Sequence, residues 1–206
     1  PIVNEDSQLM TAQSVADVEI GTQNAKQVIA SLTRPEHYSC KIENTLYYQG
    51  SSSVLYCRQY VLDGAVRTDT LTSAGSVQST LLRDGDTVYA WNIGENQAYQ
   101  GRWGDFTDDA AAMLPTYEDV LAENVTLTAA GRENIDYDPC IRVEFEQNGY
   151  RCIYHISAAT GLLKQAAFYS GDTLARLVKV NDLVTDAPDD TYFELPNGQS
   201  ILGENH

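Results

Sequence analysis

Short turns recur along the first half of the chain at intervals of ten or eleven residues. They are Asp63-Gly64, Ala74-Gly75, Asp84-Gly85 and the corner that begins at Gly94. Asp-Gly is well suited to the two positive φ angles of a type I′ turn, whose twist matches the strands that it joins. The runs between these turns are rich in Val, Leu, Tyr, Trp and Thr. Residues 38–101 are therefore predicted to form consecutive antiparallel hairpins, a β-meander.

A meander of this length has to curl, because a long antiparallel sheet must cover its apolar face. The predicted fold class is α+β, mostly antiparallel β: a curved, unclosed half-barrel of about eleven strands with an N-terminal helix and a helical lid insert. The predicted strands cover residues 38–48, 54–62, 65–73, 76–83, 86–93, 97–101, 125–136, 139–147, 150–157, 162–170 and 173–184.

Two segments have helical rather than strand spacing. Residues 23–32 carry an apolar stripe and end before Pro35, because the residue that precedes a proline is disfavoured in the α region. Residues 106–124 interrupt the strands, with Thr107 and Thr116 as the predicted N-caps of two short helices. Helices that interrupt a meander must lie over a face or the mouth of the sheet. The insert is therefore expected to act as a lid.

The turn chemistry also predicts which residues face each other across the strands. A two-residue turn at Asp63-Gly64 places Arg58 opposite Asp69, as a cross-strand pair of opposite charge, and it places Tyr60 opposite Arg67. Tyr56 should then face Leu71.

The four cysteines lack the spacing of a zinc site, since no C-x-x-C pair and no nearby histidine pair accompanies them. A two-residue turn at Asn148-Gly149 places Phe145 opposite Cys152, and places Cys140 opposite Ser157. Cys140 and Cys152 should then point to opposite faces of the sheet. The disulfide connectivity stays open, and the four residues are Cys40, Cys57, Cys140 and Cys152.

Composition excludes some classes of partner. The net charge is -16 and the pI about 4.3, which repels nucleic acid and anionic membrane surfaces. Residues 1–13 are polar and are expected to be a flexible tether behind a removed export or lipid-anchor segment, so that any membrane attachment would run through that anchor. Residues 14–206 are expected to form one domain, and the location is expected to be extracytoplasmic: the periplasm or the cell surface.

No residue pattern indicates catalysis. His37, His155 and His206 have no serine or cysteine nearby in a nucleophile context, and the turn aspartates are explained by their turns. We expect a protein that is not an enzyme, with no cofactor, no metal and no catalytic residue.

Three segments resemble the LolA-like lipoprotein carrier superfamily, which includes LolA-type carriers, LppX-type lipid-binding lipoproteins and the regulator RseB. Residues 153–171 (IYHISAATGLLKQAAFYSG) resemble its strand, T-G-L turn and following strand, and residues 172–198 resemble its final strand and F-x-x-P-x-G ending. The segment DTVYAWNIGENQAYQG resembles its middle strand pair. The resemblance extends over most of residues 22–202, and it implies a half-barrel that binds an apolar group or a protein of the cell envelope.

The expected function is therefore binding. The first hypothesis is a lipid, an acyl chain or a lipidated protein held on an apolar concave side. The alternative is a regulatory or structural cell-envelope protein that acts through protein partners, its cavity filled by its own side chains. The predicted ligand-binding residues are Tyr89, Trp91, Ile93, Val143, Phe145, Tyr154 and Ile156.

Overall fold

The computed structural model describes residues 15, 17–106, 109 and 111–203. Its strands follow the order β6-β5-β4-β3-β2-β1-β11-β10-β9-β8-β7, and every strand pairing described is antiparallel. The predicted fold class is confirmed, since the sheet is unclosed, with β6 and β7 at its two ends, and carries only short helices. The elements are α2 (Ala25–Ser31), β1 (Tyr38–Tyr48), β2 (Ser51–Leu62), β3 (Ala65–Leu71), β4 (Val77–Asp84), β5 (Thr87–Asn92), β6 (Tyr99–Arg102), α3 (Glu118–Leu121), β7 (Leu127–Ile135), β8 (Asp138–Gln147), β9 (Tyr150–Ser157), β10 (Leu163–Ser170), β11 (Thr173–Val184) and the 3₁₀ helix η1 (Asp190–Phe193).

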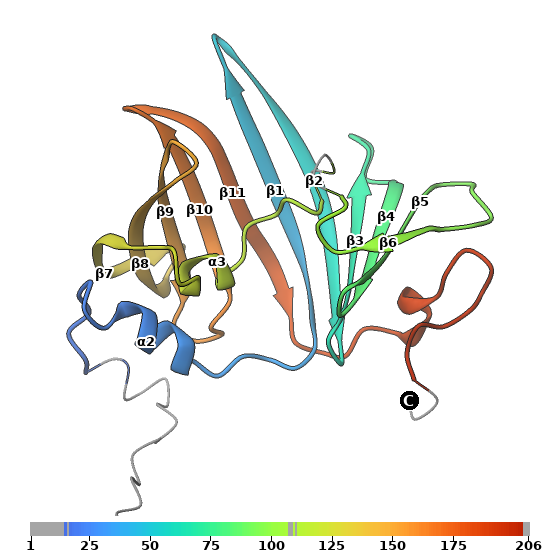
Figure 1. Ribbon diagram of the computed structural model, residues 1–206, viewed down its shortest axis with the longest axis horizontal. Coiled ribbons are helices and arrows are strands. Elements are labelled where there is room, and N and C mark those ends of the chain that lie inside the picture. The colour runs from blue at the N-terminus through green and yellow to red at the C-terminus, as the bar shows by residue number, and fades with distance from the viewer. Residues whose placement is uncertain (1–14, 16, 107–108, 110, 204–206) are drawn as a thin grey trace, which may run out of the picture. The chain divides into compact units, whose positions relative to one another are not determined.

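The chain divides into two compact units. Unit 1 comprises residues 1–34 and 115–174, and unit 2 comprises residues 35–114 and 175–206. Unit 1 contains α2, α3 and β7 to β10, and unit 2 contains β1 to β6, η1 and nearly all of β11. The strands and α-helices are labelled in Figure 1. The expectation of one domain over residues 14–206 stays a prediction, and the expected tether, residues 1–13, lies outside the described residues.

The helices are shorter than predicted. The helix expected at residues 23–32 runs from Ala25 to Ser31, and its N-cap is Asn24. In the insert, the described part of the first predicted helix is a turn at residues 111–113. Its predicted cap, Thr107, lies outside the described residues. The second helix is a single turn, α3.

The predicted registers are confirmed. Arg58 pairs with Asp69, Tyr60 with Arg67 and Tyr56 with Leu71. The ion pair found for Asp69, however, is with Arg67, two positions away on the same strand, at 2.8 Å. Asp69 is only 2% exposed, and it also accepts a hydrogen bond from Thr80.

The cysteine register is confirmed as well. Cys140 faces Ser157 and Cys152 faces Phe145, so the two thiols lie on opposite faces of unit 1. In unit 2, Cys57 pairs with Ile42 and Cys40 with Gln59, which puts Cys40 and Cys57 on one face. All four cysteines are buried and free.

The C-terminal segment covers one face of the unit 2 sheet. On one face, Leu62, Ala65 and Leu82 form a buried cluster with Phe193 of the C-terminal segment. Arg67 Nη1 donates to the carbonyl oxygen of Tyr192 at 3.0 Å, and the Tyr60 and Tyr192 rings stack at 4.0 Å. These contacts fix residues 189–202 against the strands.

Candidate functional site

The first candidate site is the apolar face of the unit 1 sheet. Val143 pairs with Tyr154 and Ile141 with Ile156, and Phe145 lies two positions beyond Val143, so that these side chains share one face. The structure therefore brings together four predicted ligand-binding residues: Val143 (0% exposed), Phe145 (0%), Tyr154 (2%) and Ile156 (0%). The ring of Tyr154 contacts two other rings on this face, with its centroid 5.1 Å from that of Phe145 and 5.9 Å from that of Phe168.

Two helices cover this face. We call α2 and α3 together the helical cover; α2 lies against both β8 and α3 (Figure 1). The buried side chains of the helical cover are Ala25, Val28 and Ile29 of α2 and Val120 of α3. Tyr154 is the polar link between cover and sheet, because its hydroxyl donates to Asp119 Oδ2 at 2.8 Å.

Lys26 joins the two helices of the cover. Its Nζ donates to the carbonyl oxygen of Ala122 at 2.8 Å and also to that of Val125. Carbonyl groups at a helix C-terminus have no partner within the helix, and a cation there satisfies them. Lys26 therefore ties α2 to the end of α3.

Arg34 fastens the other end of the cover. Its guanidinium donates to the carbonyl oxygens of Ile29, Leu32 and Gly161, at 2.6, 3.0 and 2.8 Å. It also lies 3.6 Å from the centre of the Tyr117 ring. Burial lowers the pKa of Arg34, against the opposing effects of Tyr117 and Glu118.

Gly161 is required by this contact. Its φ is +68°, and a Cβ at this position would lie 2.7 Å from Arg34 Cγ and 3.1 Å from the Cβ of Leu32. The T-G-L turn that carries the family resemblance is therefore the place where the segment after α2 packs onto the β9-β10 turn.

The other predicted ligand-binding residues lie in unit 2. Tyr89 pairs with Leu82 and Trp91 with Thr80, and both aromatic side chains pack against the cluster under the C-terminal segment. Ile93 follows β5 and is 73% exposed.

Unit 2 contains a pocket of about 610 Å³ on the face opposite to Tyr89 and Trp91, since its lining residue Ser79 pairs with Thr70 and alternates with Thr80. The lining is mostly polar and includes two carboxylates. A carboxylate beside an acyl chain would lose hydration without compensation, so this pocket suits a polar ligand better. The lining residues are Leu55, Thr70, Gln78, Ser79, Asp105, Phe106 and Asp109.

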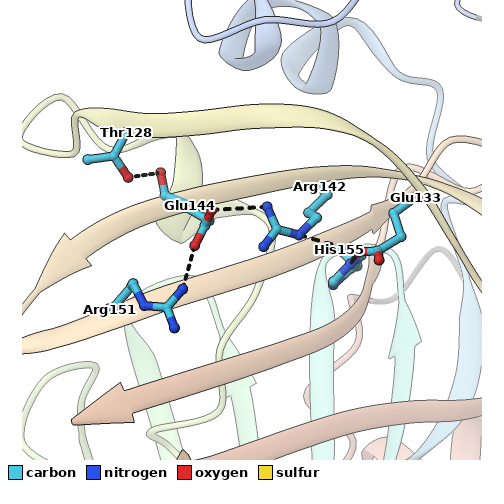
Figure 2. A network of polar contacts seen from close by, with 6 residues as sticks. All are labelled: Thr128, Glu133, Arg142, Glu144, Arg151 and His155. Atoms are coloured by element: carbon cyan, nitrogen blue, oxygen red, sulfur yellow. Dashed lines mark hydrogen bonds and ion pairs between the residues drawn. The ribbon is translucent and has the colours of Figure 1, made fainter. Parts of the chain in front are cut away.

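A network of charged side chains lies on the other face of unit 1 (Figure 2). Glu133 contacts Arg142 at 3.3 Å, Arg142 contacts Glu144 at 3.1 Å, and Glu144 contacts Arg151 at 2.8 Å. Burial pushes the pKa of Glu144 upward, but the hydrogen bonds from Arg142 and Arg151 outweigh it, and the pKa lies below its ordinary value.

His155 extends this network. Its Nε2 lies 2.5 Å from Glu133 Oε2, and its buried Nδ1 has no hydrogen-bond partner among the described residues. A nucleophile would have to hydrogen-bond to this nitrogen for base catalysis. We therefore interpret the network as structural contacts that link β7, β8 and β9. Within the described ranges, no cluster of three or more histidine, cysteine or acidic residues has the geometry of a metal site.

Sequence reasoning missed the residues that hold the cover. Asp119, Lys26 and Arg34 each reach a partner far along the chain, as with Arg34 and Gly161, 127 positions apart. Only the glycine of the T-G-L turn carried a signal, because glycine is favoured where φ is positive.

These features define a class of open antiparallel sheet protein with a short helical cover, and solved structures of this class exist. An uncharacterized conserved protein from Thermus thermophilus matches with a TM-score of 0.56 and 10% identity, over 82% of this chain and 90% of that one. A LolA superfamily protein from Nitrosomonas europaea matches with a TM-score of 0.41 and 9% identity, over 84% and 97%.

The MucA/MucB complex of Pseudomonas aeruginosa also matches, with a TM-score of 0.46 and 18% identity, over 87% of this chain and 63% of that one. A putative outer membrane lipoprotein-sorting protein domain from Vibrio parahaemolyticus also matches, with a TM-score of 0.42 and 12% identity, over 80% of this chain and 91% of that one. At these identities the likeness concerns the fold, and no function passes from these structures to this chain. No protein-family model and no curated protein sequence matches.

No described helix has the length and apolar character required to cross a bilayer.

Proposed function

We propose that this chain is a non-catalytic, extracytoplasmic binding protein that holds an acyl chain, of a lipid or of a lipidated protein, against the apolar face of unit 1. The observation that carries the proposal is a sheet face with a buried apolar centre, which two short helices cover. Ile141, Val143, Phe145 and Ile156 are 0% exposed under this cover. An acyl chain on this face would replace the apolar side chains of the cover.

Binding requires the helical cover to move away from the sheet face, and the polar contacts that hold the cover determine the free energy that this opening costs. The cover is fastened by Tyr154 to Asp119, by Lys26 to the end of α3 and by Arg34 to the β9-β10 turn. Each such hydrogen bond contributes about 1 kcal/mol net. A bound acyl chain contributes about 0.8 kcal/mol of binding free energy for each CH₂ group that it buries. A long acyl chain can therefore offset the loss of several links.

The test measures uptake of a dansyl-labelled fatty acid by fluorescence. Ala130 is half-buried and pairs with Val143 on the apolar face, whereas the adjacent half-buried Ala129 pairs with Glu144 on the other face. Ala130→Trp places an indole on the acyl site and should reduce uptake about tenfold or more, as loss of at least 1.4 kcal/mol requires. Ala129→Trp is the matched control and should bind like the parent chain.

A second candidate function is supported by the same burial. The side chains predicted to line a cavity fill their own face, and β7 is paired only with β8 in the described part of unit 1, so that its outer edge can accept a strand of a partner protein. If the parent chain takes up no fatty acid, and a partner's binding is lost when a proline is placed in β7, for example Ala129→Pro, this second function replaces the first.

A further inference from the structure

The β1-β2 hairpin of unit 2 ends in a free ribbon. Pairing of β1 with β11 stops at Leu46, and pairing of β2 with β3 stops at Tyr56. Among the described residues, the segment between them, residues 47–55, pairs only within the hairpin. Tyr47 pairs with Ser52, Tyr48 pairs with Ser51, and residues 53–55 pair with residues 44–46 of β1. Figure 1 shows this hairpin projecting beyond β3 to β5 of the same unit. At about 3.3 Å per residue, the free part is roughly 10 Å long.

The ribbon carries apolar side chains on both of its faces. Side chains alternate along a strand, so that Leu46 and Tyr48 point to one face and Tyr47 to the other. Val54 pairs with Thr45 and therefore shares the face of Tyr47. All are well exposed: Leu46 41%, Tyr47 39%, Tyr48 58%, Val54 42% and Tyr56 42%.

The ribbon is also free of charge in a chain with a net charge of -16. Residues 44–57 contain no Asp, Glu, Lys, Arg or His. The polar groups at the tip are hydroxyls and amides, and Tyr48 and Ser53 hydrogen-bond to each other at 3.2 Å. Side chains with an apolar body and a polar end are favoured at the boundary between lipid headgroups and acyl chains.

We propose that the free ribbon, residues 47–55, with the exposed side chains of Leu46 and Tyr56 at its base, inserts into the interfacial region of a zwitterionic lipid bilayer. A flat protein surface would contact one face of a ribbon, whereas an interface that the tip enters end-on contacts both. The roughly 10 Å of free ribbon matches the 5–10 Å depth to which interfacial segments are buried. The negative charge of the rest of the chain selects neutral over anionic lipid. This contact does not depend on acyl binding by unit 1.

The test uses co-sedimentation of the whole chain with phosphatidylcholine vesicles. The parent chain should bind, and substituting 30% of the lipid with phosphatidylglycerol, on the order of the anionic content that gives a substantial surface potential, should weaken binding. Leu46→Ser with Tyr48→Ser removes one face, and Tyr47→Ser with Val54→Ser removes the other. Each pair should lower the partition coefficient at least tenfold, because insertion would bury the 39–58% of each side chain that is exposed in the free chain.

Three further measurements separate insertion of the ribbon from other causes of vesicle binding. Tyr137, 100% exposed at the β7-β8 turn of unit 1, is the matched aromatic, and Tyr137→Ser should leave vesicle binding unchanged. Tyr48→Trp should show a blue-shifted emission that lipids brominated on the acyl chain quench. The serine variants should keep the parent's dansyl fatty acid uptake, so that failure here and failure of the proposed function are distinguishable. Absence of binding by the parent chain, or loss of binding from one face only, overturns the proposal.

Discussion

The hydroxyl of Tyr154 on β9 donates a hydrogen bond to Asp119 of α3 over 2.8 Å, and this contact joins the covered sheet face of unit 1 to its helical cover. The ring of Tyr154 is packed against Phe145 and Phe168, so its position is set by the apolar face itself. One residue thus belongs both to the proposed acyl site and to the link that closes it.

Removing this hydroxyl should loosen the cover without changing the apolar face. Tyr154→Phe keeps the ring and is expected to cost about 1 kcal/mol of unfolding free energy, since a single net hydrogen bond is lost. Fatty acid uptake should become faster in stopped-flow fluorescence. Tyr169→Phe, on the other face of the sheet beside Arg151, is the control and should leave the uptake rate unchanged. Slower uptake by Tyr154→Phe would contradict the proposed opening.

The Arg34 contact predicts a difference between two glycines. Gly161→Ala meets both a positive φ and the Arg34 side chain, whereas Gly171→Ala meets a similar φ of +60° with no atom within 4 Å of the added Cβ. The strain common to both costs about 1 kcal/mol. Gly161→Ala should lose further stability in urea unfolding, because Arg34 must move. Equal losses of unfolding free energy for the two variants would show that the contact between Arg34 and Gly161 contributes nothing measurable to stability.

The four thiols should be unreactive in the folded chain. Burial raises the pKa of Cys40 to about 12 and that of Cys57, Cys140 and Cys152 to about 11 each. The reactive thiolate is therefore scarce at mildly alkaline pH, and Ellman's reagent should label the protein only after unfolding. Because the folded pKa values lie above those of the unfolded thiols, the thiols lower stability as the pH rises from about 9 toward 11 to 12. Rapid labelling of any cysteine would contradict this burial.

The charged network should show its contribution on acidification. The pKa of Glu144 is below its ordinary value of 4.5, so its stabilising contribution is complete above that pH and is lost as the pH falls through the folded pKa. Glu144→Gln should destabilise unit 1 by about 1 kcal/mol at neutral pH, because its partners are partly solvated. The difference from the parent chain should shrink in acid. A difference that is constant with pH would mean that the glutamate charge is not what the arginines stabilise.

Much of the fold follows from local chemistry. The Asp63-Gly64 and Asn148-Gly149 turns have only two residues each, so the turn fixes the register, and the predicted pairs are found in the structure. The same rule could not name the ion pair of Asp69, since Arg67 and Arg58 both share its face and only packing under Tyr192 selects Arg67.

The structure brings together only four of the seven predicted ligand-binding residues, because strand alternation does not show which segment covers a face. Strand alternation shows that Tyr89 and Trp91 share a face, but it does not show which face the C-terminal segment covers. Phe193, about a hundred positions further on, decides that. For Val143 and Phe145 the covering helices were themselves visible in the sequence. The residues that fasten the cover, Lys26 and Arg34, bind backbone carbonyl groups, which carry no sequence signal.

Photocrosslinking can locate an acyl chain bound on the apolar face of unit 1. A palmitate analogue with a diazirine in its chain is bound to the purified protein, irradiated and mapped by peptide mass spectrometry. We expect label on residues 141–145 of β8 and 154–156 of β9, and we expect excess palmitate to displace it. Label confined to other segments, or no displaceable label, would contradict it.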